Sequence, residues 1–155
     1  MISRRFMLCG PLLLLLAGCG EDKPKTKLKI AGGGLQFNYR YSQASIVIVV
    51  QAKGDMPEGG TIEALFDMPG TTNRERVSQP IFIGKLAYQF QTSPMLGIKK
   101  DEVFKVTVRL LDKAGLELES QDTQFKSDQD QSTLPDRPLV DPSKPNYVPQ
   151  LENLK

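Results

Sequence analysis

Residues 104–110 read Phe-Lys-Val-Thr-Val-Arg-Leu, and this stretch decides the expected fold. Its apolar residues, Phe104, Val106, Val108 and Leu110, alternate with Lys, Thr and Arg. In an extended chain, successive side chains point to opposite faces, so the apolar set shares one face and the polar set shares the other. The stretch therefore predicts a β-strand with one face in a hydrophobic core and the other in water.

Stretches of the same kind lie on both sides of this strand, and turn residues such as Gly, Pro and Asp separate them. Three consecutive glycines, residues 32–34, interrupt the first stretch and predict a β-bulge or a strand that crosses between sheets. In the last stretch Phe125 has the opposite parity to the preceding leucines, which predicts a bulge near residues 120–123. No stretch has a helical period. The expected strands cover residues 28–41, 45–52, 62–66, 76–83, 86–90, 104–110 and 116–125.

Seven or eight short strands with regular turns predict an all-β fold, a single antiparallel β-sandwich. Residues 96–98 and 104–109 resemble the approach to the sixth strand in immunoglobulin-like and fibronectin type III-like domains, with Phe104 near the place of the corner tyrosine. The resemblance covers residues 28–127. A core Cys pair and a core Trp are both missing, which excludes an antibody-type domain. A transthyretin-like sandwich is the alternative.

The amino terminus has the order of a secretory signal. A basic start at residues 1–5 is followed by an apolar run at residues 6–16 and then by small residues. The run is shorter than the ~20 residues that a membrane-spanning helix needs, which disfavours an uncleaved anchor helix. We therefore expect residues 1–18 to be a signal peptide and residues 19–27 to be a tether.

The residues at the end of this signal, Leu16, Ala17, Gly18 and Cys19, resemble the lipobox of bacterial lipoproteins. The resemblance implies that a peptidase recognises Leu16, Ala17 and Gly18, cuts before Cys19, and leaves the cysteine acylated. Two or three acyl chains make a durable membrane anchor. Gly20 follows the cysteine where Asp usually retains a Gram-negative lipoprotein in the inner membrane, so the resemblance implies the outer membrane, facing the periplasm.

The balance of charge argues against nucleic acid as a partner. The chain has 20 basic and 18 acidic residues, and residues 1–18 contain Arg4 and Arg5 but no acid. The expected mature chain is therefore formally neutral, whereas binding to nucleic acid depends on many contacts from Lys and Arg to phosphates.

The missing residue types argue against catalysis. The chain has no His, and its two cysteines, Cys9 and Cys19, lie in or directly after the expected signal peptide. We therefore predict that the protein is not an enzyme and holds no cofactor. The acidic pairs at residues 101–102 and 128–130 lack the ligand count of a calcium loop, so no metal site is expected. A periplasmic hydrolase would require a deep pocket with a perturbed acidic residue.

Two features offer a surface for a partner. Residues 46–50 are apolar at both parities, so Val47 and Val49 either lie under neighbouring side chains or form an exposed patch that binds a partner. Residues 128–155 contain repeated prolines and predict an extended or disordered tail that could dock on a partner.

Together these features predict a lipid-anchored, non-catalytic protein-interaction or structural module of the cell envelope. Its expected partners are the membrane and an envelope protein. The alternative is a small-ligand-binding lipoprotein associated with a transporter. The sequence sets no oligomeric state.

Overall fold

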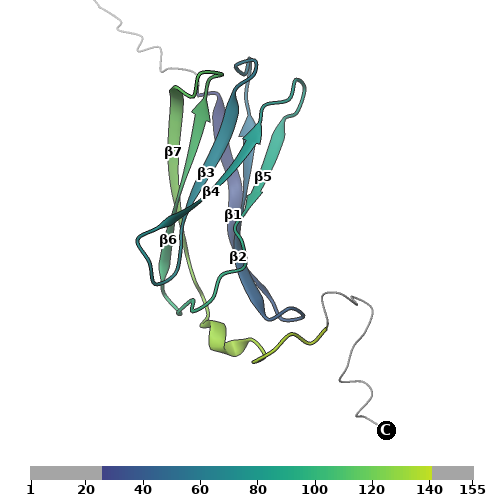
Figure 1. Ribbon diagram of the computed structural model, residues 1–155, viewed down its shortest axis with the longest axis vertical. Helices are drawn as coiled ribbons and strands as arrows, with labels where there is room; N and C mark the ends of the chain where they lie inside the picture. Colours follow the sequence, from purple (N-terminus) through teal and green to yellow (C-terminus); the bar gives the residue numbers. More distant parts are fainter. Residues whose placement is uncertain (1–25, 141–155) are drawn as a thin grey trace, which may run out of the picture.

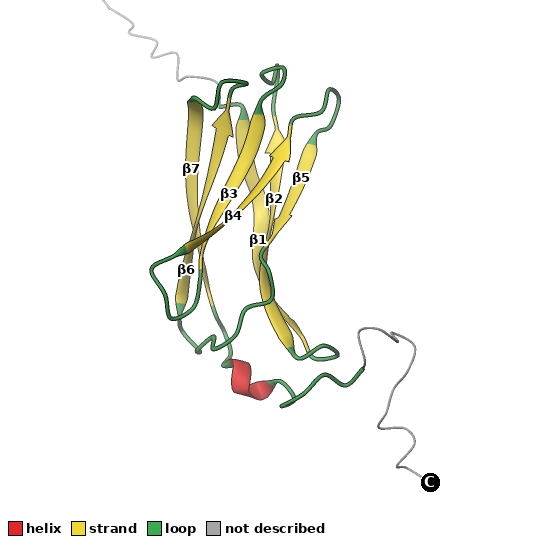
Figure 2. Ribbon diagram, in the orientation of Figure 1, coloured by secondary structure: helices red, strands yellow, loops and turns green. Residues whose placement is uncertain are grey.

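The computed structural model describes residues 26–140. The predicted signal peptide, the lipobox residues Leu16, Ala17, Gly18 and Cys19, and the end of the predicted tail, residues 141–155, lie outside this part. Figure 2 shows strands joined by turns and one short 3-10 turn, and the described part of the chain contains no α-helix. The elements are β1 (Leu28–Asn38), β2 (Gln43–Ala52), β3 (Thr61–Asp67), β4 (Arg74–Pro80), β5 (Ala87–Gln91), β6 (Val103–Leu111), β7 (Glu117–Lys126) and η1 (Gln131–Thr133).

The strands form two antiparallel sheets that face one another (Figure 1). One sheet has the order β1-β2-β5, and the other has the order β4-β3-β6-β7. The prediction of an all-β fold is confirmed, and two facing antiparallel sheets are compatible with a β-sandwich.

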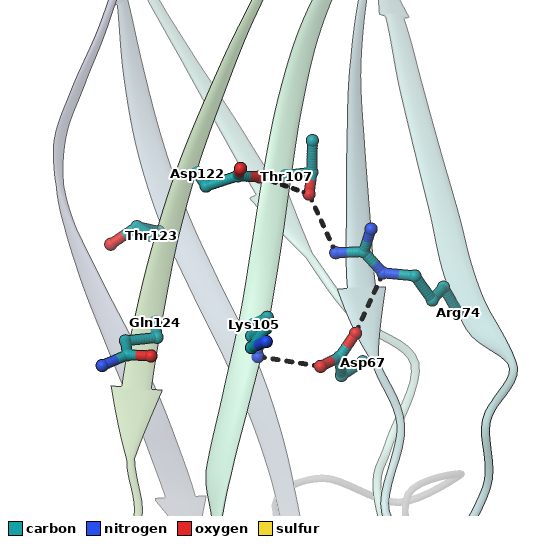
Figure 3. Close-up of a pocket in the computed structure, with 7 residues that line it drawn as sticks. All are labelled: Asp67, Arg74, Lys105, Thr107, Asp122, Thr123 and Gln124. Carbon is teal, nitrogen blue, oxygen red and sulfur yellow. Dashed lines mark hydrogen bonds and ion pairs between the residues drawn. The ribbon is translucent and has the colours of Figure 1, made fainter.

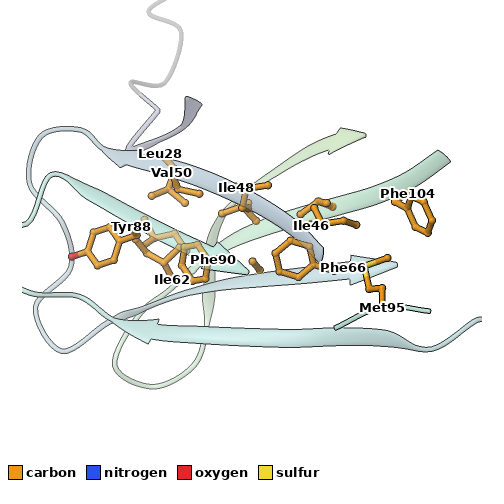
Figure 4. Packing of buried hydrophobic residues seen from close by; sticks show 14 of the residues in the cluster. Leu28, Ile46, Ile48, Val50, Ile62, Phe66, Tyr88, Phe90, Met95 and Phe104 are labelled. Carbon is orange, nitrogen blue, oxygen red and sulfur yellow. The ribbon is translucent and has the colours of Figure 1, made fainter. Parts of the chain in front are cut away.

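The alternation seen in the sequence places the core between the two sheets. Four side chains of β6, from Phe104 to Leu110, point inward and are at most 1% exposed. Tyr88 of β5 is also buried, and its hydroxyl accepts a hydrogen bond from the backbone N–H of Phe82 at 3.0 Å, which satisfies its polar end. The core residues drawn and labelled in Figure 4 are Leu28, Ile46, Ile48, Val50, Ile62, Phe66, Tyr88, Phe90, Met95 and Phe104.

The glycine cluster produces a bulge and no change of sheet. β1 pairs with β2 along its whole length, and the register shifts between Ile30 and Gly32, so Ala31 is the additional residue. The predicted bulge is therefore confirmed, and the alternative of a strand crossing between sheets is wrong. The strand also ends earlier than expected, at Asn38, because the Asn38 side chain accepts hydrogen bonds from the backbone N–H groups of Arg40 and Tyr41 and stabilises a turn.

The last strand differs from its prediction. The register shift in the β6–β7 pair leaves Leu118 as the additional residue, so the bulge precedes residues 120–123. Leu116 and Leu118 are exposed, and the more buried parity of β7 carries Glu119, Gln121 and Thr123 as well as Phe125. Gln121 on that parity donates a hydrogen bond to the carbonyl of Leu28 at 2.7 Å, which joins the edges of the two sheets.

The predicted tail from residue 128 requires a correction for residues 128–140. This segment packs against the end of the domain, where Leu134 and Val140 are buried. The Gln131 side chain accepts a hydrogen bond from the Ile98 N–H and donates one to the Met95 carbonyl. Apolar burial and these hydrogen bonds hold the segment in place although prolines keep most of it from forming regular structure.

Candidate functional site

The outer face of the four-stranded sheet carries a continuous set of polar side chains. On β3 the inward residues are Ile62, Ala64 and Phe66, so Glu63 and Asp67 point outward. The neighbouring strands contribute side chains of the same outward parity. These are Arg74 and Arg76 from β4, Lys105, Thr107 and Arg109 from β6, and Asp122 and Gln124 from β7.

Glu63 is the buried anion of this face. It is 3% exposed and lies directly opposite Arg109 in the β3–β6 pair. Arg109 donates to Glu63 Oε2 through both Nε, at 3.0 Å, and a terminal nitrogen, while Arg76 Nε lies 2.9 Å from Glu63 Oε1. The hydrogen bond to Glu63 raises the pKa of Arg109. Two guanidinium groups therefore compensate the cost of burying this carboxylate.

A groove with a volume of about 690 Å³ lies beside this cluster, and Figure 3 shows the side chains that line it. Arg74 Nε lies 2.9 Å from Asp67 Oδ1, and another nitrogen of Arg74 donates to the Thr107 hydroxyl at 3.1 Å. The Thr107 hydroxyl in turn donates to Asp122 Oδ1 at 2.6 Å. These contacts join all four strands of the sheet, β3, β4, β6 and β7, and hold the polar groups of the groove in fixed positions.

Two groups in the groove keep free hydrogen-bonding capacity. Within residues 26–140, the Lys105 ammonium makes no hydrogen bond or ion pair, and neither does the amide side chain of Gln124. Both side chains are exposed beside the fixed Arg74–Thr107–Asp122 row. The groove can therefore offer one ammonium and one amide to a polar partner without breaking an internal contact.

The structure places Val47 and Val49 on the opposite sheet, outside this groove. Val47 is 7% exposed and Val49 is half-buried. Gln91 lies opposite Val47 in the β2–β5 pair, and its amide donates to the Ser45 hydroxyl at 3.1 Å, across the same outer face. The exposed patch considered for these two valines is therefore not formed at Val47, because neighbouring side chains cover it.

Asp101 and Asp130, one residue from each acidic pair of the sequence, have structural partners. Lys126 Nζ lies 2.6 Å from Asp101 Oδ1, and this hydrogen bond lowers the pKa of Asp101. Asp130 accepts a hydrogen bond from the Ser132 N–H at the start of η1, which lowers the pKa of Asp130. Among residues 26–140, no three His, Cys, Asp or Glu side chains lie close enough together to hold a metal ion.

Sequence reasoning did not identify the groove. The sequence signal for it is the set of charged residues at alternate positions of 63–67 and 105–109, which places charges on one face of two adjacent strands.

In the described part of the chain, no helix has the length and apolar character needed to cross a membrane.

Comparison with known proteins gives matches to solved structures alone. No protein-family model matches the chain, and no curated protein is similar to it in sequence. A structure of wild-type OgpA from Akkermansia muciniphila is similar over 71% of this chain at 16% identity, with a TM-score of 0.39. A catalytically inactive OgpA in complex with an O-glycopeptide substrate is similar over 66% at 13% identity, with a TM-score of 0.35. This chain covers 30% of each OgpA chain.

These matches correct one prediction. The sequence predicted that the protein is not an enzyme. The solved structures that it matches are of OgpA, and one of them is a catalytically inactive form in complex with an O-glycopeptide substrate. With TM-scores of 0.33 to 0.39, the matches transfer no activity to this chain.

Proposed function

We propose that this protein is a lipoprotein of the outer membrane, anchored through acylated Cys19, whose β-rich domain binds a protein of the cell envelope in the periplasm. The lipobox-like residues Leu16 to Cys19 support the anchor. The uncovered groove beside Lys105 and Gln124 supports the binding function and is the observation that carries it. A fixed polar surface with free donors suits recognition of a partner that supplies carboxylates and carbonyl groups.

The strand order supports an immunoglobulin-like or fibronectin type III-like sandwich. In a constant-type immunoglobulin domain, the first, second, fifth and fourth strands form one sheet, and the third, sixth and seventh form the other. Here β4 pairs with β3, so the fourth strand belongs to the second sheet. The proposed domain is therefore a variant of that topology in which one edge strand has changed sheets.

The volume of the groove supports a second candidate function. In this alternative, the protein binds a small polar ligand and is associated with a transporter. Ligand sites commonly have volumes of about 300–1,000 Å³, and the groove falls within this range. Such sites usually enclose the ligand, whereas this groove is open along the sheet, as Figure 3 shows. A protein partner fits an open sheet face better.

The test uses the full chain with its native leader, expressed in a Gram-negative host. A photo-crosslinking amino acid replaces Gln124 in the groove, and a matched control carries it at Gln89, an exposed position on the other sheet. We expect one reproducible protein adduct from position 124 and none from position 89. The change Lys105→Glu should remove the adduct, because it places a negative charge where the proposed partner meets an ammonium.

Fractionation and mass spectrometry of the same cells test the anchor. Acylated Cys19 in the outer-membrane fraction is the expected result. An unmodified Cys19 in a soluble fraction contradicts the anchor, and equal labelling from positions 124 and 89 contradicts the binding face. Acylation with no adduct at position 124 favours the small-ligand function.

A further inference from the structure

The β4–β5 connection, residues 81–86, exposes large apolar side chains to water. Ile83 is 95% exposed, Leu86 is 73% exposed and Phe82 is 56% exposed. Isolated apolar residues on a surface are ordinary, but three within five positions of one loop form a contiguous apolar tip.

Hydrogen bonds hold this loop in one conformation. The Lys85 N–H donates to the Phe82 carbonyl at 3.1 Å, and the Ala52 N–H donates to the Leu86 carbonyl at 2.9 Å. The hydroxyl of buried Tyr88 accepts from the Phe82 N–H. Gly84 has a φ of 80°, which allows the tight turn. The apolar side chains are therefore presented outward by a backbone that is fixed from within.

Other exposed apolar residues gather at the same end of the domain. This end contains the β2–β3, β4–β5 and β6–β7 connections and the beginning of β1, at the top of Figure 1. Leu116 and Leu118 follow the β6–β7 turn and are exposed there. Five of the eight exposed large apolar residues of the described chain thus lie at this end. A depression of about 730 Å³, lined by residues 54–59 and 81–86, adds to the apolar surface.

The chain also enters the domain at this end. Lys27 is bound to the β2–β3 connection, because the Lys53 N–H donates to its carbonyl at 2.7 Å and its ammonium donates to the Asp55 carbonyl at 2.8 Å. Cys19 precedes Thr26, the first described residue, by seven positions. A chain spans at most ~3.6 Å per residue, so the acyl anchor of the proposed function lies within about 25 Å of this end.

The charges at this end are mixed. The basic residues include Lys27, Lys53, Lys85 and Lys113, and the acidic ones include Asp55, Glu58, Asp112, Glu117 and Glu119. Electrostatic attraction to anionic lipids is therefore weak, and burial of apolar side chains provides the main attraction to a lipid surface.

We propose that the β4–β5 loop is a membrane-contact site, which inserts Phe82, Ile83 and Leu86 into the headgroup region beside the acyl anchor. The inference rests on the proposed anchor at Cys19, which brings this end to the membrane. The contact gives the domain a second attachment and directs residues 128–140, at the opposite end, away from the lipid.

The test uses the absence of Trp from the chain, which makes a single introduced Trp an unambiguous reporter. The full, acylated Ile83→Trp protein is placed in vesicles of phosphatidylethanolamine and phosphatidylglycerol, with and without brominated acyl chains. The matched control is Leu96→Trp, because Leu96 is 73% exposed and lies at the opposite end of the domain. The Trp emission of Ile83→Trp should be blue-shifted, and brominated lipid should quench most of its intensity. Added salt should change the shift and the quenching little. Leu96→Trp should show neither the shift nor the loss.

Flotation of the vesicles separates failure of the loop from failure of the anchor. Protein that floats with the vesicles while Ile83→Trp emits as in water overturns the loop contact and leaves the anchor intact. Unacylated protein that still binds and is quenched contradicts the anchor and supports the loop. Protein that neither floats nor is quenched overturns both. A blue shift that depends on protein concentration and not on lipid assigns the surface to a second copy of the chain and overturns the membrane contact.

Discussion

Gly33 of β1 and Phe125 of β7 lie against each other where the edges of the two sheets meet. A Cβ atom on Gly33 would lie 2.9 Å from Phe125 Cζ and closer still to the carbonyl oxygen of Val47. Both distances are shorter than any ordinary van der Waals contact. The close approach of β1 to the Phe125 ring therefore requires glycine at this position.

We predict that Gly33→Ala destabilises the domain by about 1–3 kcal/mol, because the added methyl group forces the backbone of β2 and the Phe125 ring apart. Gly34→Ala is the matched control, since a Cβ there would meet nothing within 4 Å. Urea unfolding of both variants checks the prediction. Equal stabilities for the two variants would show that the sheet edge tolerates the methyl group.

The pairing of Glu63 predicts unequal effects for its two arginines. Arg109→Ala should lower the free energy of unfolding by about 1–3 kcal/mol, because it leaves a buried carboxylate with one cation. Arg76→Ala should have a smaller effect, since the Arg76 side chain is more exposed and makes one contact with Glu63. Thermal unfolding measures both. A larger loss for Arg76→Ala would contradict the assignment of Arg109 as the principal partner.

Acid should weaken the contacts of Asp101 and Asp130. Hydrogen bonds from Lys126 and Ser132, respectively, lower the pKa of these carboxyl groups. A carboxyl group with a depressed pKa in the folded state contributes stability above its unfolded pKa of about 3.9, and this stability is lost as the pH falls through the folded pKa. Asp130→Asn should therefore lose less stability than the wild type between neutral pH and pH values below about 4.

The control for this prediction is Asp128→Asn, because the Asp128 carboxylate makes no hydrogen bond or ion pair within the described residues. Chemical unfolding at several pH values gives the comparison. If the wild type and Asp130→Asn show the same pH dependence, the cap at the beginning of η1 does not stabilise the fold through its charge.

The segment of residues 128–140 should contribute to stability. Leu134→Ala should lower the free energy of unfolding by about 2 kcal/mol, because it removes a buried side chain at the end of the domain. Leu96→Ala, at an exposed position, should change it little. Differential scanning calorimetry distinguishes the two. If Leu134→Ala leaves the free energy of unfolding unchanged, residues 128–140 pack against the domain without stabilising it.

The sequence predicted the strands well where alternation was regular. Residues 104–110 fall within β6, and their apolar parity forms the core as expected, because a two-residue period needs no tertiary information. The prediction was wrong at the beginning of β7, where the bulge lies at Leu118 and not at residues 120–123, and Leu116 and Leu118 are exposed. A bulge changes the parity of every residue beyond it, and the pairing with β6 determines where the bulge lies.

The positions of the groove and of the buried ion pair could not be read from alternation alone, for a related reason. Glu63 and Arg109 are 46 positions apart, and alternation alone places each on the outer face without placing them opposite one another. Their pairing follows from the register of β3 against β6. The burial of Glu63 also requires Arg76 from a third strand, which comes close only after β4 joins this sheet.

The sequence by itself determined the all-β class, the inward and outward faces of most strands, and the lipobox-like residues that motivate the proposed anchor, since these are local patterns of polarity. Only the tertiary structure decided which outward side chains meet, why Gly33 must be glycine, and how residues 128–140 pack. It also brought the apolar β4–β5 loop to the end where the chain enters the domain. Each of these depends on contacts between segments far apart in sequence, and the assembly of the sheets alone brings such segments together.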